Sequence, residues 1–165
     1  MPGAFSALTG RVAEHLLARS ELLACAESCT GGWVAKVCTD LAGSSGWFER
    51  GFVTYSNASK QELLGVSAAT LAGHGAVSEA TVTEMAAGVL EHSAAHWALA
   101  ISGIAGPGGG SADKPVGTVW IAWAGPDNWQ RAQCHHFEGD REAVRRQAVA
   151  AALQGLLEQL DASTR

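Results

Sequence analysis

The 165-residue chain has 47% hydrophobic residues, 16% charged residues and a formal net charge of −5. This composition excludes a disordered chain, and the negative charge argues against a general nucleic-acid surface, although it allows a local cationic pocket for one small anion. No apolar run approaches the roughly 20 residues that span a bilayer, and the N-terminus lacks a basic leader before an apolar block. We therefore expect one domain over residues 1–165, in the cytoplasm, with neither a membrane nor a nucleic acid as partner.

Helices and strands alternate in the first part of the chain. Apolar residues over 5–16 follow one face of a helix, and "LLACA" (22–26) predicts a short buried strand. A second helix is expected to begin near Thr30 and to end before "AGSSG". The segment 51–56 then predicts a second strand, and 58–65 a short helix that Gly65 ends.

The second part of the chain begins with the clearest helix, over 78–93, with Ser78 as its cap. The continuous apolar run "WALAISGIAG" that follows is typical of a strand covered on both faces. Two further strands are expected in 116–125 and 131–137, as a hairpin, and a last helix spans roughly 140–160. The order of elements predicts a three-layer α/β/α domain around a mixed β-sheet.

The segment "ESCTGG" (27–32) concentrates reactive groups where a buried strand should meet a helix. Ser28 could attack a bound carbonyl there, while the backbone N–H groups of Thr30, Gly31 and Gly32 hold the developing oxyanion. Cys29 is the rival nucleophile, because a helix N-terminus also lowers the pKa of a thiol. From this stretch alone, a simple helix cap at Ser28 or Thr30 is the favoured interpretation, because serine and threonine are common helix caps.

A serine nucleophile needs a group that takes its proton, and none of the six histidines offers a clear partner. A desolvated lysine is the alternative base. Lys60 is one of three lysines, and it follows the only tyrosine, Tyr55, at the end of a predicted strand. If that strand lies beside the one ending at Ala26, both groups reach the sheet edge where α/β proteins bind ligands. Otherwise Lys60 would lie on an exposed helix face.

Two further segments supply candidates for binding an anion. "SGIAGPGGG" (102–110) follows a buried strand and can turn its N–H groups around an anion, although it is neither a Walker loop nor a dinucleotide fingerprint. Arg141 and Arg145 lie four residues apart at the start of the last helix and suit a phosphate or carboxylate. A plain flexible turn and salt bridges to neighbouring acidic residues are the alternatives.

The four cysteines (Cys25, Cys29, Cys38 and Cys134) have no C-x-x-C spacing, so neither a zinc knuckle nor a thioredoxin-like site is indicated. We expect reduced, buried thiols. No ligand cluster suggests a metal, and we expect no cofactor.

Taken together, "AESCTGGWVAKV", "WFERGFVTYSNASK", "HGAVSE", "SGIAGPGGG", "KPVGTVW" and "GDREAVRRQA" resemble the nicotinamide-nucleotide amidase family, the stand-alone form of the competence-damage protein (CinA) C-terminal domain. The resemblance implies a three-layer fold and hydrolysis of the carboxamide of nicotinamide mononucleotide to nicotinic acid mononucleotide and ammonia. It also implies that Ser28 is the nucleophile, with Lys60 and Tyr55 as proton-transfer partners. The expected substrate-binding residues are Ser102, Gly103, Gly106, Gly108, Arg141 and Arg145.

The hypothesis is that Lys60, assisted by Tyr55, deprotonates Ser28 and that the resulting acyl-enzyme is hydrolysed by water. The only partner it requires is the small nucleotide substrate, and a homo-oligomer is compatible with it. Two alternatives stay open: a non-catalytic nucleotide-binding module, and an amidase acting on another small amide.

Overall fold

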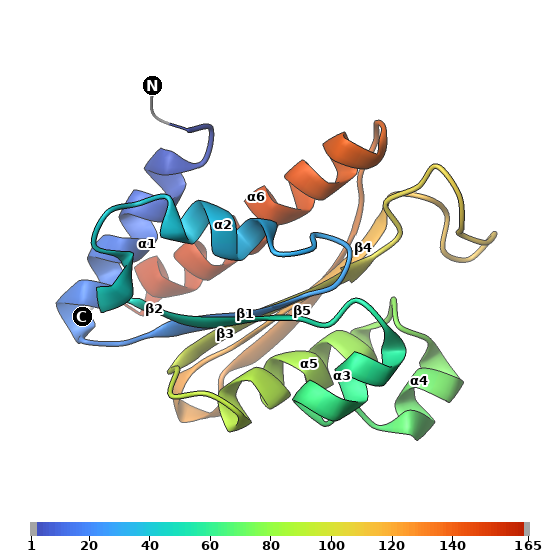
Figure 1. Cartoon of the computed structure of the whole chain (residues 1–165), viewed down its shortest axis with the longest axis horizontal. Coiled ribbons are helices and arrows are strands. Elements are labelled where there is room, and N and C mark those ends of the chain that lie inside the picture. The colour runs from blue at the N-terminus through green and yellow to red at the C-terminus, as the bar shows by residue number, and fades with distance from the viewer. Residues whose placement is uncertain (1–2, 164–165) are drawn as a thin grey trace.

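A five-stranded mixed β-sheet forms the middle layer of the computed structural model, which describes residues 3–163 (Figure 1). Its strand order is β2-β1-β3-β4-β5, with β1 parallel to β2 and β3, and the other neighbours antiparallel. The sheet and its covering helices confirm the expected α/β/α architecture. The strands are β1 (Leu23–Glu27), β2 (Phe48–Val53), β3 (Trp97–Gly103), β4 (Thr118–Ala124) and β5 (Gln130–His136).

Helices cover both faces of the sheet, three on each side (Figure 1). One layer holds α1 (Ser6–Arg19), α2 (Trp33–Thr39) and α6 (Arg141–Ala162), and the other holds α3 (Asn57–Leu64), α4 (Ala68–His74) and α5 (Glu79–Glu91). Two single turns of 3₁₀ helix, η1 (Ser44–Gly46) and η2 (Pro126–Asn128), lie in the connections. No helix in the described part of the chain is both long and apolar enough to cross a membrane.

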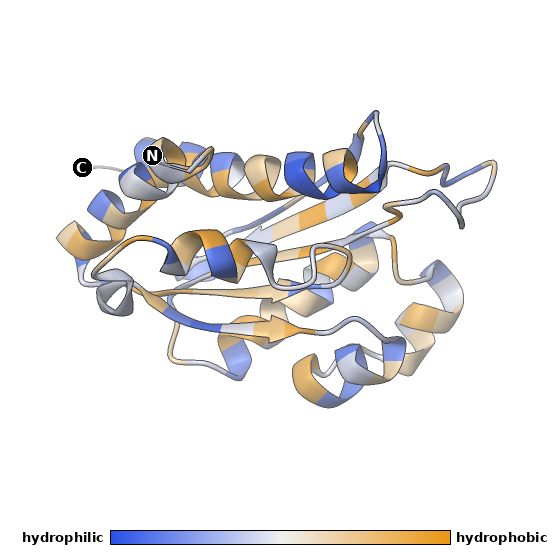
Figure 2. Ribbon diagram, turned by 45° about the horizontal axis from the view of Figure 1, so that its top comes forward, coloured by the Kyte–Doolittle hydropathy of each residue, from blue (hydrophilic) through white to orange (hydrophobic). Residues whose placement is uncertain are grey.

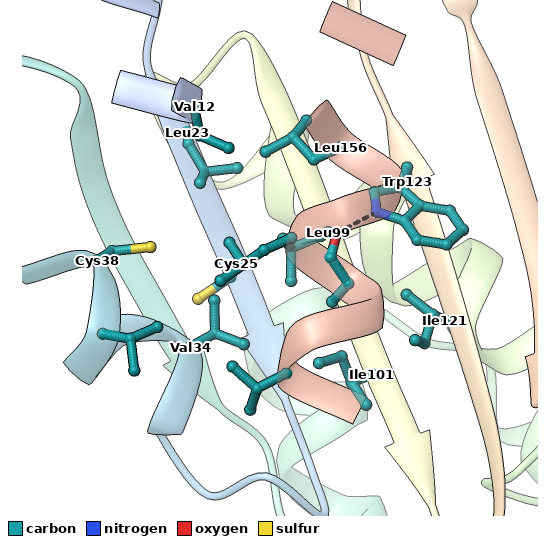
Figure 3. Close-up of a cluster of buried hydrophobic side chains, with 14 of the residues drawn as sticks. Val12, Leu23, Cys25, Val34, Cys38, Leu99, Ile101, Ile121, Trp123 and Leu156 are labelled. Carbon is teal, nitrogen blue, oxygen red and sulfur yellow. Dashed lines mark hydrogen bonds between the residues drawn. The ribbon is translucent and has the colours of Figure 1, made fainter. Parts of the chain in front are cut away.

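The buried strands present different side chains to the two layers. Leu99 and Ile101 of β3 belong to the core beneath α1, α2 and α6, whereas Ala98 and Ala100 face α5. This alternation follows from the period of two in a strand. Figure 3 shows the larger core, where Trp123 of β4 packs against α6 and donates its Nε1–H to the carbonyl of Ala152 at 2.8 Å.

Most predicted elements are present, with shifted ends. The helix expected at 78–93 is α5, and Ser78 caps it by accepting a hydrogen bond from the N–H of Thr81. The second strand begins at Phe48, three residues earlier than expected, because it pairs along the whole of β1. Helix α4 was not predicted, since "AATLAGH" is only seven residues long and contains a glycine.

The expected start of the second helix near Thr30 is wrong. Helix α2 begins at Trp33, with Gly32 as its N-cap. Gly31 and Gly32 have φ values of +60° and +103°, in the left-handed region, which a right-handed helix does not contain. Residues 28–32 therefore form a separate turn between β1 and α2, and we call them the serine turn.

Replacing Gly155 by alanine should lower the free energy of unfolding by about 1–3 kcal/mol, because a Cβ there would overlap the ring of Trp123. Helix propensity alone favours alanine over glycine by about 1 kcal/mol. A loss of stability in Gly155→Ala would therefore show that the contact with Trp123 outweighs helix propensity. Urea unfolding measures it. Gly10→Ala in α1 is the matched control, since nothing lies within 4 Å of its added Cβ, and it should stabilise. Equal stabilisation by both substitutions would contradict the close helix–sheet contact.

Candidate active site

Ser28, Thr54 and Ser102 meet at the carboxyl edge of the parallel strands. The N–H of Ser28 donates to the carbonyl of Ile101 at 3.0 Å, and the N–H of Thr54 donates to the carbonyl of Glu27 at 2.9 Å. These bonds continue the pairing of β1 with its two neighbours. Ser102 is 1% exposed, and Ser28 is 8% exposed. The edge where α/β sheets bind ligands thus carries three hydroxyl side chains, at the ends of three neighbouring strands.

Lys60 projects from α3 to this edge and is 1% exposed. Its Nζ donates to Ser28 Oγ at 3.0 Å, to the carbonyl of Thr54 at 2.8 Å and to that of Tyr55 at 3.3 Å. Burial lowers the pKa of the Lys60 amine from its ordinary value of 10.5, because an ammonium ion loses its hydration there. The alternative of an exposed lysine on a helix face is therefore wrong. The pair has the geometry of a nucleophile and its base.

Tyr55 contacts the pair through its main chain and not through its phenol. Its carbonyl accepts from Lys60 Nζ, and Ser28 Oγ lies 3.5 Å from the same oxygen. The side chain is 62% exposed, and its hydroxyl accepts a hydrogen bond from Arg141 Nη2 at 3.3 Å. A proton-transfer role for the phenol stays a prediction, whereas the carbonyl already orients the amine.

The serine turn provides backbone donors beside Ser28. Within residues 3–163, the N–H groups of Thr30 and Gly32 have no hydrogen-bond acceptor, whereas Gly31 donates its N–H to the carbonyl of Ser28 at 3.1 Å. Of the three expected oxyanion donors, Thr30 and Gly32 are thus available in this structure and Gly31 is engaged. A Cβ added at Gly31 would face Arg145 and one at Gly32 would face Val53. Gly31 therefore leaves room for Arg145 as well as allowing the turn, whereas Gly32 is required only by its positive φ value.

Glu27 is a site residue that the sequence did not reveal. It is 1% exposed at the end of β1, and its carboxylate accepts from the N–H groups of Val34 at 2.8 Å and Ala35 at 3.1 Å. A carboxylate at the start of a helix satisfies orphan N–H groups and complements the helix dipole. It closes the serine turn by linking the strand before it to the helix after it. A carboxylate at the end of an otherwise apolar strand was the available signal.

Two hydroxyls at the site have no partner in the described part of the chain. The Oγ1 atoms of Thr30 and Thr54 are buried without a hydrogen bond, and both residues are 0% exposed. Neither side chain was expected at the site. Buried hydroxyls are normally satisfied, so these two positions are consistent with a site that gains polar partners when it is occupied.

Cys29 lies next to Ser28 but in a different environment. It is 5% exposed, and burial raises the pKa of its thiol to about 11, despite the nearby Arg145 and Lys60. The expectation that the pKa of this thiol is lowered is therefore wrong, because burial outweighs the groups that favour the thiolate. At neutral pH this cysteine is a thiol and not a thiolate.

The glycine-rich segment lies beside the same edge of the sheet. Arg141 Nη1 donates to the carbonyl of Gly106 at 2.8 Å, so one arginine links this segment to Tyr55. Gly103 ends β3, where a Cβ would lie 2.6 Å from Val119 Cγ2, so its lack of a side chain serves strand packing. Gly108 is exposed with open space around it. Contact of these glycines with a substrate stays a prediction.

Arg145 lies against the serine turn. Its Nε donates to the carbonyl of Cys29 at 2.9 Å and its Nη2 to that of Thr30 at 3.3 Å. Neither Arg141 nor Arg145 forms a salt bridge among residues 3–163, so the acidic-neighbour alternative does not hold for them; the pair that does form is Arg146 with Glu142. The described part of the chain, residues 3–163, contains no group of three or more His, Cys, Asp or Glu side chains that could hold a metal ion.

Comparison with known proteins places this chain in a family. The model of the CinA C-terminal domain matches residues 5–160. The nicotinamide-nucleotide amidohydrolase PncC of Escherichia coli K12 is 59% identical over 92% of this chain and 92% of its own length. The protein of the same name from Pseudomonas putida is 51% identical over 92% of this chain and 94% of its own length.

Solved structures of similar proteins have the same fold as this chain. A competence/damage-inducible protein from Agrobacterium tumefaciens superposes with a TM-score of 0.92 at 41% identity, covering 98% of each chain. The competence damage-inducible protein A of Klebsiella pneumoniae superposes with a TM-score of 0.91 at 43% identity, covering 96% of this chain and 98% of its own chain. The chain therefore belongs to the CinA C-terminal domain family.

Proposed function

We propose that this chain hydrolyses the carboxamide of nicotinamide mononucleotide to nicotinic acid mononucleotide and ammonia. The observation that carries the proposal is the 3.0 Å hydrogen bond between the buried amine of Lys60 and Ser28 Oγ. The printed names of the similar amidohydrolases support the choice of substrate. A module that only binds a nucleotide has no need of a desolvated lysine beside a serine hydroxyl, and burying that amine is costly.

The reaction divides into two transfers. Neutral Lys60 accepts the hydroxyl proton of Ser28, whose Oγ attacks the amide carbon, and the carbonyl oxygen becomes an oxyanion beside the N–H groups of Thr30 and Gly32. As the intermediate collapses, the C–N bond breaks and the Lys60 ammonium returns the proton to the departing nitrogen, so ammonia leaves. Water then attacks the ester with Lys60 again as base, which releases the acid and restores the Ser28 hydroxyl.

The phosphate end of the substrate is assigned to the edge formed by Arg141 and the glycine-rich segment. Arg141 is exposed, and its guanidinium lies between Tyr55 and Gly106 at the start of α6. A guanidinium beside a helix N-terminus suits a phosphate. All four cysteines are free thiols, which supports the cytoplasm as the compartment of this reaction.

Ser28→Ala should abolish ammonia release from nicotinamide mononucleotide while leaving the fold intact, because the hydroxyl is the only group removed. Ammonia release by both proteins, with a chelator present, and their thermal unfolding measure this. A folded Ser28→Ala protein that turns over at the wild-type rate would end the proposal. A wild-type protein that the nucleotide stabilises against heat but that releases no ammonia would identify a binding module.

The activity should rise with pH. Since Lys60 must be neutral to act as base and burial lowers its pKa below 10.5, kcat/KM should increase as the pH rises through that lowered pKa and then level off. Lys60→Arg should be inactive at every pH tested, because a guanidinium stays protonated. A profile measured from about pH 6 to about pH 10 tests this. Activity that falls over this range would contradict the role of Lys60.

Alkylation of the thiols distinguishes Ser28 from Cys29 as the nucleophile. The buried thiol of Cys29, with its pKa raised to about 11, should not react with iodoacetamide near pH 8 in the folded protein, whereas the partly exposed Cys134 should react first. Activity should survive, and Cys29→Ala should keep at least about a third of wild-type kcat. Peptide mass analysis identifies the modified cysteine. Loss of activity in step with Cys29 modification would transfer the nucleophile to the thiol.

A further inference from the structure

Arg145 is built into the serine turn from outside it. The residue lies in the second turn of α6, which passes close to the β1–α2 connection (Figure 1), and it donates to two consecutive carbonyls, those of Cys29 and Thr30. Its guanidinium lies 5.6 Å from the ring centroid of Trp33, the first residue of α2. Figure 2 shows hydrophilic bands in these first turns of α6, alternating with hydrophobic ones. The guanidinium is thus held on two sides, by main chain and by an aromatic face.

The absence of a side chain at Gly31 leaves room for Arg145 to lie close to the serine turn. A Cβ at this position would lie 3.3 Å from Arg145 Nη2, and the φ value of +60° already disfavours any other residue. Glu27 fixes the far end of the turn through the N–H groups of Val34 and Ala35. Gly31 and Gly32, which follow Thr30, restrict the backbone of the turn less than other residues would. Arg145 restrains the middle of the turn.

The restraint determines where the backbone donors point. In a trans peptide, the carbonyl and the following N–H lie on opposite sides, and the only cis bond in residues 3–163 is Gly106–Pro107. With the carbonyl of Cys29 turned to Arg145, the N–H of Thr30 must point the opposite way. That N–H has no acceptor in the described chain. Rotation of this peptide would change the direction of the Thr30 N–H.

We propose that Arg145 is a positioning residue that holds the Thr30 N–H toward the oxyanion formed when Ser28 attacks the amide. The inference rests on the proposed amidase function. It replaces the expectation that Arg145 binds the substrate phosphate, because its Nε and Nη2 donate to the serine turn. A forked guanidinium reaches two carbonyls at once, which a lysine ammonium does with less directional control.

The experiment compares wild type, Arg145→Met and Arg146→Met on nicotinamide mononucleotide and on nicotinamide riboside, which lacks the phosphate. Arg146 is the matched control: it also lies over Trp33, at 5.9 Å, but is exposed and bonds to Glu142 instead of the serine turn. Loss of one oxyanion donor costs about 100-fold or more in kcat. We expect that loss in Arg145→Met on both substrates, with KM within about threefold of wild type, and near-normal kinetics in Arg146→Met.

The pH profile separates this role from general loosening. If only the Thr30 N–H is displaced, the midpoint of the rising limb, set by Lys60, stays at its wild-type value in Arg145→Met. A kcat of Arg145→Met within about threefold of the wild-type kcat would overturn the inference. A loss confined to the mononucleotide, which would identify a phosphate ligand, or a shifted midpoint would also overturn it.

Arg145→Lys provides a second variant in case Arg145→Met does not fold. Its kcat should lie between that of the wild type and that of Arg145→Met. A wild-type kcat in folded Arg145→Lys, with Arg145→Met unfolded, would reduce Arg145 to a structural role. Wild-type protein that releases no ammonia from either compound would instead refute the proposed function, so the two failures are distinguishable.

Discussion

The exclusion of one amine from water is the constraint on which the site depends. Lys60 is buried at the edge of the sheet, where an ammonium ion would lose its hydration. Two main-chain carbonyls, of Thr54 and Tyr55, replace part of that hydration and aim Nζ at Ser28. Helix α3 and the end of β2 must therefore keep their positions relative to β1, and the α/β/α packing supplies that rigidity. The lowered pKa is a consequence of the fold itself.

The serine turn is also held in place by contacts from other parts of the chain. A strand before it ends in Glu27, a helix after it is capped by that carboxylate, and Arg145 approaches from a helix more than a hundred residues later in the chain. Each contact involves main-chain atoms of the turn or of α2, so the hydroxyl and the free N–H groups remain unobstructed. The geometry of the nucleophile is thus fixed by groups that do not themselves react.

Much of this was predictable from the sequence, and the remainder has a physical explanation. Apolar runs identified β1 and β3, and the edge rule brought Lys60 to Ser28 although they are 32 residues apart. The start of α2 was misplaced because Gly31 and Gly32 adopt left-handed conformations that helix periodicity does not encode. The contacts of Arg145 escaped prediction because any residue can supply a main-chain carbonyl, so the acceptors leave no signature in residue type.

The site of acylation during turnover distinguishes Ser28 from Cys29 as the nucleophile. The reaction with nicotinamide mononucleotide would be quenched in acid within the first turnovers, digested with trypsin, and the peptide from residue 20 to residue 36 fragmented in a mass spectrometer. We expect the nicotinoyl nucleotide as an ester on Ser28, and we expect no such ester in Ser28→Ala. The same group found on Cys29 would contradict this expectation.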